Sequence, residues 1–134
     1  MDTVTVAVET EVNSTEDEDK VRAAVNNILS GASLEIKQTR QGSTLVAEAK
    51  GQDSLIKLRN MLRNDRIRDA ARKLLFKSIH GNTIGFYLNK QVAYAGHISF
   101  CEETAESPLG PIRIIIETDD PRQLVEWLAE KTER

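Results

Sequence analysis

Positively charged side chains are concentrated in one segment of the sequence. Residues 57–77 hold eight of the 18 lysines and arginines and only two acids, so the segment carries a formal charge of +6. The whole chain carries −3, which leaves −9 for the remainder. Five of the eight cations are arginines, whose guanidinium groups can bind a phosphate through two parallel hydrogen bonds. This composition indicates a surface for a polyanion such as RNA.

The same segment has a second interpretation. Asp65 and Asp69 can pair with cations three or four positions away on a helix, and arginine stems can cover apolar surface. Two carboxylates cannot neutralise eight cations, but the excess could meet the acidic run Glu16–Asp19 of a second copy. Two hypotheses therefore stay open: RNA binding, or a homodimeric protein-interaction and assembly module with no nucleic-acid role.

Residues typical of catalysis or metal binding are sparse. His97 and Cys101 are four positions apart, which on a strand separates them by about 13 Å, too far to share a metal ion. The sequence contains no HExxH, GxSxG, GxxxxGK[ST] or GxGxxG pattern. No two carboxylates are arranged as an acid and a base. We therefore expect a protein that is not an enzyme and that uses no metal and no cofactor.

The elements that position these residues form a single predicted α+β domain over residues 1–134. Alternating apolar residues predict a strand from Val4, and the run 112–118 predicts a buried strand. Apolar stripes predict helices that begin at Thr15 in a capping box, at Asp53, after Asn64 and at Pro121. Residues 33–50 and 83–100 each predict a hairpin, the second turning at Asn89-Lys90.

The expected order is β-α-β-β-α-α-β-β-β-α, with the helices on one face of a mostly antiparallel sheet. The pattern leaves open whether residues 53–63 and 65–79 form two helices or one bent helix. Residues 102–111 are polar and rich in proline, and they predict a loop.

On the helix predicted after Asn64, an apolar stripe faces the core and directs the basic residues outward. Six of the eight predicted RNA contacts lie in this basic segment, and two lie at hairpin tips: Arg59, Arg63, Arg66, Arg68, Arg72 and Lys73, then Arg40 and Lys90. The chain has only six aromatic residues, and most fit core positions, so base stacking is not expected. Structured RNA, recognised through its shape and phosphates, fits a basic helix better.

The sequence also predicts the cellular setting. One cysteine cannot form an internal disulfide, and the N-terminal residues lack the basic start of a signal peptide. No apolar run approaches the length of a membrane span. We expect a cytoplasmic protein with no membrane contact.

Three strings carry a family resemblance: RIRDAARKLL (66–75), LNKQVAYAGHISF (88–100) and SPLGPI (107–112). Together they resemble an archaeal family of uncharacterised function that is labelled predicted RNA-binding, with a conjectured link to the exosome. The resemblance extends over nearly the whole chain. It implies a fold similar to the large-subunit ribosomal protein that binds the small ribosomal RNA, a tendency to form homodimers, and a place in an RNA-processing complex. It supplies no binding residues.

Overall fold

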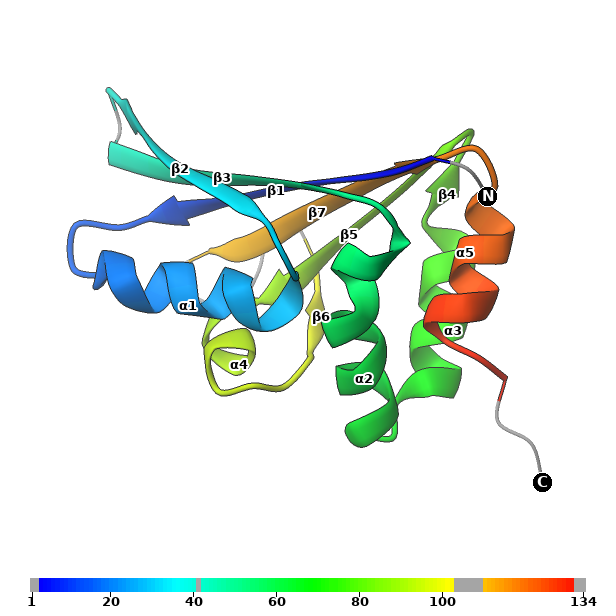
Figure 1. Cartoon of the computed structure of the whole chain (residues 1–134). Helices are drawn as coiled ribbons and strands as arrows, with labels where there is room; N and C mark the ends of the chain where they lie inside the picture. Colours follow the sequence, from blue (N-terminus) through cyan, green and yellow to red (C-terminus); the bar gives the residue numbers. More distant parts are fainter. Residues whose placement is uncertain (1–2, 41, 103–109, 132–134) are drawn as a thin grey trace.

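The computed structural model describes residues 3–40, 42–102 and 110–131 (Figure 1). One antiparallel sheet of seven strands forms the first layer, in the order β2-β3-β1-β7-β5-β4, and β6 pairs with β5. The strands are β1 (Val4–Val12), β2 (Ser33–Thr39), β3 (Gly42–Lys50), β4 (Ile79–His80), β5 (Thr83–Asn89), β6 (Phe100–Cys101) and β7 (Pro111–Thr118).

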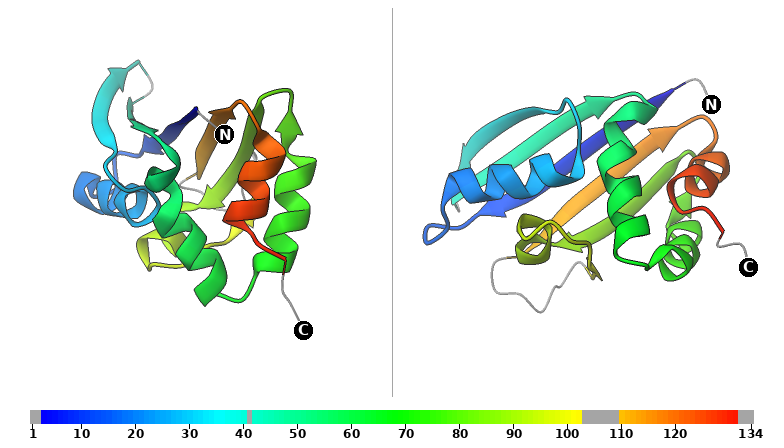
Figure 2. Two further views of the ribbon diagram at one scale, coloured as in Figure 1. Left: turned by 45° about the vertical axis from the view of Figure 1, so that its right-hand side comes forward. Right: turned by 60° about the horizontal axis from the view of Figure 1, so that its bottom comes forward.

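The helices form the second layer and cover one face of the sheet (Figures 1 and 2). They are α1 (Glu18–Ile28), the 3₁₀ turn η1 (Gln52–Leu55), α2 (Ile56–Asn64), α3 (Arg68–Lys77), α4 (Lys90–Tyr94) and α5 (Pro121–Leu128). The predicted α+β class and the predicted element order are confirmed. The structure adds α4 and shows that α2 and α3 are separate helices.

The core lies between the sheet and the helices. Along β1, Val4, Val6 and Val8 are buried, whereas Ala7 and Glu9, which alternate with the buried residues, are exposed. Val8 is paired with Ile114 on β7, and both side chains face the helices. Each side chain of this size contributes about 1.5–3 kcal/mol when it is fully buried.

Two predicted helix starts are wrong by a few residues. Asp17, not Thr15, caps α1, because its carboxylate accepts a hydrogen bond from the Asp19 N–H. Asp53 does not cap the second helix, which is preceded by η1 with Gly51 at its N-cap. A cap requires a local hydrogen bond, and several neighbouring acids can supply one equally well.

The turn predicted at Asn89-Lys90 is also wrong. Asn89 ends β5 and caps α4, where its Oδ1 accepts a hydrogen bond from Val92 N at 3.0 Å. Asparagine favours both tight turns and N-caps, so its presence does not distinguish them. As a result β6 begins only at Phe100, and His97 lies in the connection between α4 and β6.

The loop predicted for 102–111 lies largely outside the described residues. Among the helices that the structure describes, none is both long enough and apolar enough to cross a membrane.

Candidate nucleic-acid interface

Helices α2, α3 and α5 pack together over the end of the sheet that holds β4 (Figure 1). Leu58 and Leu62 of α2, and Ala71 and Leu75 of α3, are buried. Since these apolar positions recur every three or four residues, the basic residues between them lie on the outer sides of the two helices. The predicted outward direction of the basic helix face follows from this packing.

Two carboxylates from α5 and the residues after it bind three of the predicted arginines. The Arg72 guanidinium donates two hydrogen bonds to Glu126, at 2.7 and 2.5 Å. Glu130 accepts a hydrogen bond from Arg59, and its second oxygen lies 3.9 Å from Arg63. These pairs connect α2 and α3 to α5.

Aromatic rings support the same two arginines. The Arg59 guanidinium lies 5.2 Å from the centre of the Trp127 ring, and its Nε donates to the Trp127 carbonyl at 2.9 Å. The Arg72 guanidinium lies 4.9 Å from the centre of the Phe76 ring. Stacking of this kind fixes the plane of a guanidinium group. Arg59 and Arg72 therefore contribute to helix packing.

The carboxylate partners remain in contact with water. Hydrogen bonds from Arg72 lower the pKa of Glu126, and those from Arg59 lower the pKa of Glu130. Their side chains are 53% and 44% exposed. Ion pairs at such exposure contribute little to stability and exchange readily with other charged groups. A phosphate could therefore compete with these carboxylates.

The region stays strongly positive after these pairs are counted. The residues that follow β7, 119–131, hold four acids and two bases, a formal charge of −2, so together with the +6 of residues 57–77 the region keeps a charge of +4. Within the described part of the chain, no hydrogen bond or ion pair is formed by the side chains of Arg66, Arg68, Lys73 and Lys77. We call these four residues, together with Arg63, the basic surface.

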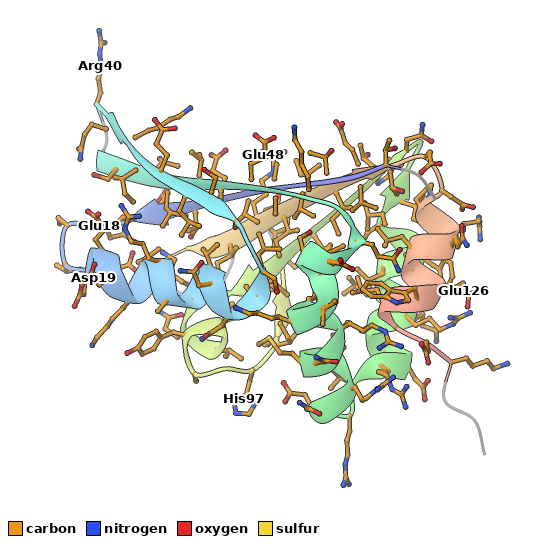
Figure 3. The ribbon with its side chains drawn as sticks, viewed as in Figure 1. Glu18, Asp19, Arg40, Glu48, His97 and Glu126 are labelled. Carbon is orange, nitrogen blue, oxygen red and sulfur yellow. The ribbon has the colours of Figure 1, made fainter. Side chains whose placement is uncertain are left out.

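Arg40, one of the two outer contacts predicted at hairpin tips, is exposed between β2 and β3. Figure 3 shows it pointing away from the molecule, at the opposite end from α3 and α5. The structure therefore separates Arg40 from the basic surface.

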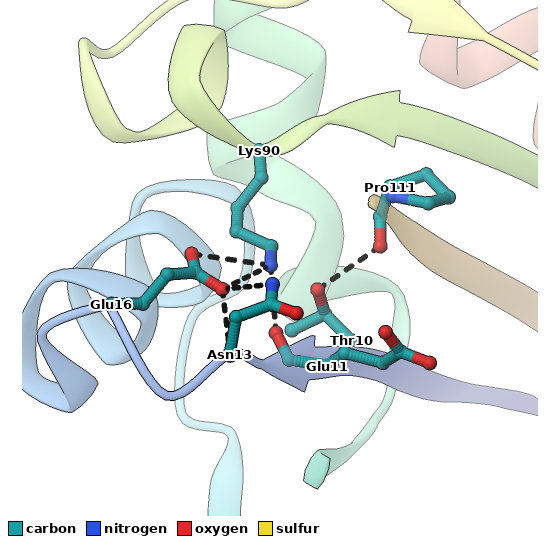
Figure 4. Close-up of polar contacts among 6 residues, drawn as sticks. All are labelled: Thr10, Glu11, Asn13, Glu16, Lys90 and Pro111. Atoms are coloured by element: carbon teal, nitrogen blue, oxygen red, sulfur yellow. Dashed lines mark hydrogen bonds and ion pairs between the residues drawn. The ribbon is translucent and has the colours of Figure 1, made fainter. Parts of the chain in front are cut away.

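The prediction of Lys90 as an outer contact is wrong. Lys90 is 3% exposed and begins α4 instead of lying at a tip. Its ammonium group donates to the Glu11 carbonyl at 2.7 Å and to Glu16 Oε1 at 3.0 Å (Figure 4). It cannot reach a phosphate while it is held there.

Two further sets of residues were not predicted. Glu126 and Glu130 have a helical spacing of four, but no local signal relates them to arginines more than fifty positions earlier. Asp65 and His97 also meet across the fold, with His97 Nδ1 2.9 Å from Asp65 Oδ1. Within the described residues, no three metal-binding side chains gather at one point.

Comparison with known proteins defines the class first. A family model described as "RNA binding" matches residues 5–118. A UPF0201 protein of Sulfurisphaera tokodaii is 46% identical over 127 residues, which is 95% of this chain and 88% of that protein. A UPF0201 protein of Pyrobaculum aerophilum is 43% identical over 125 residues, which is 92% of this chain and 87% of that protein. The chain therefore belongs to the UPF0201 family of these archaea, and it also matches the family whose model is described as RNA binding.

Solved structures agree with the fold. The UPF0201 protein of Methanococcus jannaschii superposes with a TM-score of 0.84 at 31% identity, covering 96% of this chain and 95% of that one. A protein of Methanothermobacter thermautotrophicus, titled a DUF54 protein, superposes with a TM-score of 0.58 at 18% identity, covering 96% and 95%. The second likeness concerns the fold alone.

Proposed function

We propose that the protein binds structured RNA without catalysis, through phosphate contacts made by the basic surface. The observation that carries this proposal is the set of four cations, Arg66, Arg68, Lys73 and Lys77, whose side chains form no hydrogen bond or ion pair with the described residues. The description of the family model as RNA binding supports the same ligand class. Neither a metal nor a cofactor has a part in this proposal.

The side chains of the interface favour phosphate recognition over base stacking. Phe76 is partly buried, and the guanidinium groups of Arg72 and Arg122 lie over its ring, at 4.9 and 5.7 Å from its centre. The large hydrophobic residues that the structure shows exposed are Ile56 and Tyr94, which are not part of the basic surface. Proteins that bind single strands usually offer exposed aromatic platforms. Double-stranded or folded RNA, read by shape and phosphate spacing, is therefore the proposed partner.

The test is the salt dependence of RNA affinity. Replacing Arg66 and Lys73 together by alanine should weaken binding to a duplex RNA and flatten the slope of log K against log salt by roughly two. The matched control is Lys37→Ala with Lys50→Ala, which removes two cations from the opposite face of the sheet. Unchanged affinity in the first variant, measured by fluorescence anisotropy, would remove the site assignment.

A second candidate function is assembly through the open face of the sheet. The side of the sheet away from the helices has a shallow hollow of about 770 Å³. Small and apolar side chains, including Ala7, Val46 and Ile115, line it, as do charged residues of both signs. A face with both signs of charge can complement a second copy of itself. We propose homodimer formation through this face.

The acidic run is a poorer partner for the basic helix of a second copy. Glu16 is bound to Lys90, Asp17 caps α1, and Glu18 pairs with Arg22 at 3.1 Å. These contacts engage three of the four carboxylates that this form of assembly would need. The setting that we propose for either function is the cytosol, where a lone thiol such as Cys101 stays reduced.

A further inference from the structure

Arg66, in the joint between α2 and α3, combines an exposed positive charge with a strained backbone conformation. Arg66 has a φ of 58°, and among the described residues no other amino acid except glycine has a positive φ. The left-handed conformation is unfavourable for a residue with a Cβ atom, and such strain is concentrated at functional positions. Arg66 is also exposed, and its side chain makes no hydrogen bond or ion pair with a described residue.

A histidine from a distant part of the chain is held against the same joint. Asp65, the residue before Arg66, accepts a hydrogen bond from His97 Nδ1 at 2.9 Å with one oxygen. Its other oxygen accepts the Ile98 N–H, also at 2.9 Å. The backbone N–H of His97 donates a hydrogen bond to the Val92 carbonyl at 3.0 Å, which connects this segment to α4. One hydrogen bond therefore orients the ring, and two others hold the backbone of residues 97 and 98.

This arrangement leaves one ring nitrogen available to a ligand. The His97 side chain is 64% exposed, whereas that of Asp65 is 17% exposed. Figure 3 shows His97 pointing away from the body of the molecule on the helical side. Because Nδ1–H is directed to Asp65, Nε2 carries a proton only when the imidazole is positively charged. Neutral His97 cannot donate to a phosphate, and charged His97 can.

The charged and titratable groups of the two segments bonded to residues 97 and 98 lie in the joint and in α4. At the joint and the adjoining ends of α2 and α3 they are Arg63, Asp65, Arg66 and Arg68. From α4 they are Lys90, which is buried against Glu16, and the phenol of Tyr94. Asp65 is the carboxylate in contact with His97, and both of its oxygens are already bonded.

We propose that the α2–α3 joint is a pH-dependent phosphate site, in which Arg66 and His97 contact the RNA backbone and Asp65 is the positioning residue for His97. This inference rests on the proposed RNA binding and names the part of the surface that responds to pH. Only a protonated imidazole can donate a hydrogen bond from Nε2 to a phosphate while Nδ1 is bonded to Asp65. RNA affinity should therefore rise as the pH is lowered from 8.0 to 5.5.

The experiment measures the affinity of the full chain for a labelled RNA duplex between pH 5.5 and 8.0 at constant ionic strength. One added charge-assisted phosphate contact should tighten binding about three- to tenfold at the low end of this range. His97→Gln should lose this increase, because its amide does not change charge between pH 5.5 and 8.0. His80→Gln is the matched control, since it removes the other of the two histidines, on β4.

Two further variants test the separate roles. Asp65→Asn should reduce the pH-dependent increase, because it keeps the imidazole but removes the carboxylate that orients it. Arg66→Gly should weaken binding at every pH and flatten the salt slope by about one, without lowering the thermal midpoint, because glycine accepts a positive φ.

Each contrary result has a distinct meaning. An RNA complex whose affinity does not change with pH, or whose pH dependence survives in His97→Gln, overturns this inference and leaves the proposed function standing. Loss of the pH dependence in His80→Gln alone overturns it as well. A protein that binds no RNA at any pH contradicts the proposed function, and this inference with it.

Discussion

At the scale of single residues, Lys90 shows how burial changes the role of a charged side chain. Its ammonium group is bound by Glu16 and by the Glu11 carbonyl, and the side chains of Lys90 and Glu16 are 4% and 9% exposed. Burial favours the neutral form of Glu16, but hydrogen bonds from Asn13 and Lys90 outweigh it and lower the pKa of the carboxyl group. The pair joins the β1–α1 connection to α4 and serves the fold (Figure 4).

Removing Lys90 should therefore affect stability and leave RNA affinity unchanged. Lys90→Met leaves Glu16 buried without a cation, and losing one partner of a buried pair costs about 3–5 kcal/mol. Urea denaturation measures this change in the free energy of unfolding. The control Lys37→Met, at an exposed position on β2, should change it by less than about 0.5 kcal/mol. Weaker RNA binding by a folded Lys90→Met protein would restore Lys90 as a contact.

The same pair gives a pH dependence with a definite sign. Because the pKa of Glu16 is lower in the folded protein than its ordinary 4.5, ionised Glu16 stabilises the fold above that pH. The contribution is lost as the pH falls through the folded pKa. The stability difference between the unmodified protein and Glu16→Gln should therefore be present at pH 7 and shrink below about 4.5.

At the scale of elements, the sequence patterns predict where most helices and strands lie. They do not predict which side chains of distant elements meet. Stripes such as Val21, Ala24, Val25 and Ile28 predict α1 because burial follows helical spacing. Helix α4 was missed, since Asn89 is equally suited to a turn and to an N-cap. The partners of Arg59 and Arg72 could not be predicted, because Glu126 and Glu130 approach them only after α5 packs on α2 and α3.

Helix α5 should limit RNA binding through these carboxylates. Glu126→Gln with Glu130→Gln should free the Arg59 and Arg72 guanidinium groups, raise RNA affinity about two- to tenfold, and steepen the salt slope by up to about two. The control Glu9→Gln with Glu117→Gln removes the same charge from the open face of the sheet, where both residues are exposed. Anisotropy titrations of all three proteins make the comparison.

The result distinguishes two roles of α5. An increase seen only in the Glu126 and Glu130 variant means that the carboxylates compete with phosphate. Equal increases in both variants would reflect net charge alone. Weaker binding would mean that α5 holds the arginines in the orientation that RNA requires.

At the scale of the whole molecule, the two proposed surfaces lie on opposite sides. Figure 2 shows that the helices cover one face of the sheet and leave the other uncovered. The basic surface belongs to the helical layer, and the residues that line the hollow belong to the sheet. A dimer formed through the sheet would therefore leave both basic surfaces accessible. Each copy could bind a short RNA independently, whereas a longer RNA that spans both copies would bind more tightly through its higher effective concentration.

Ile115→Lys tests this arrangement. The substitution places a charge among the apolar residues of the hollow, so it should convert a dimer into monomers as measured by light scattering after gel filtration. Affinity for a short duplex should stay the same, because the basic surface is untouched, and the added affinity for long RNA should be lost. Glu117→Lys, on the same strand but outside the hollow, is the control and should remain dimeric. An unmodified protein that is monomeric at micromolar concentration, or an Ile115→Lys protein that stays dimeric, contradicts assembly through this face.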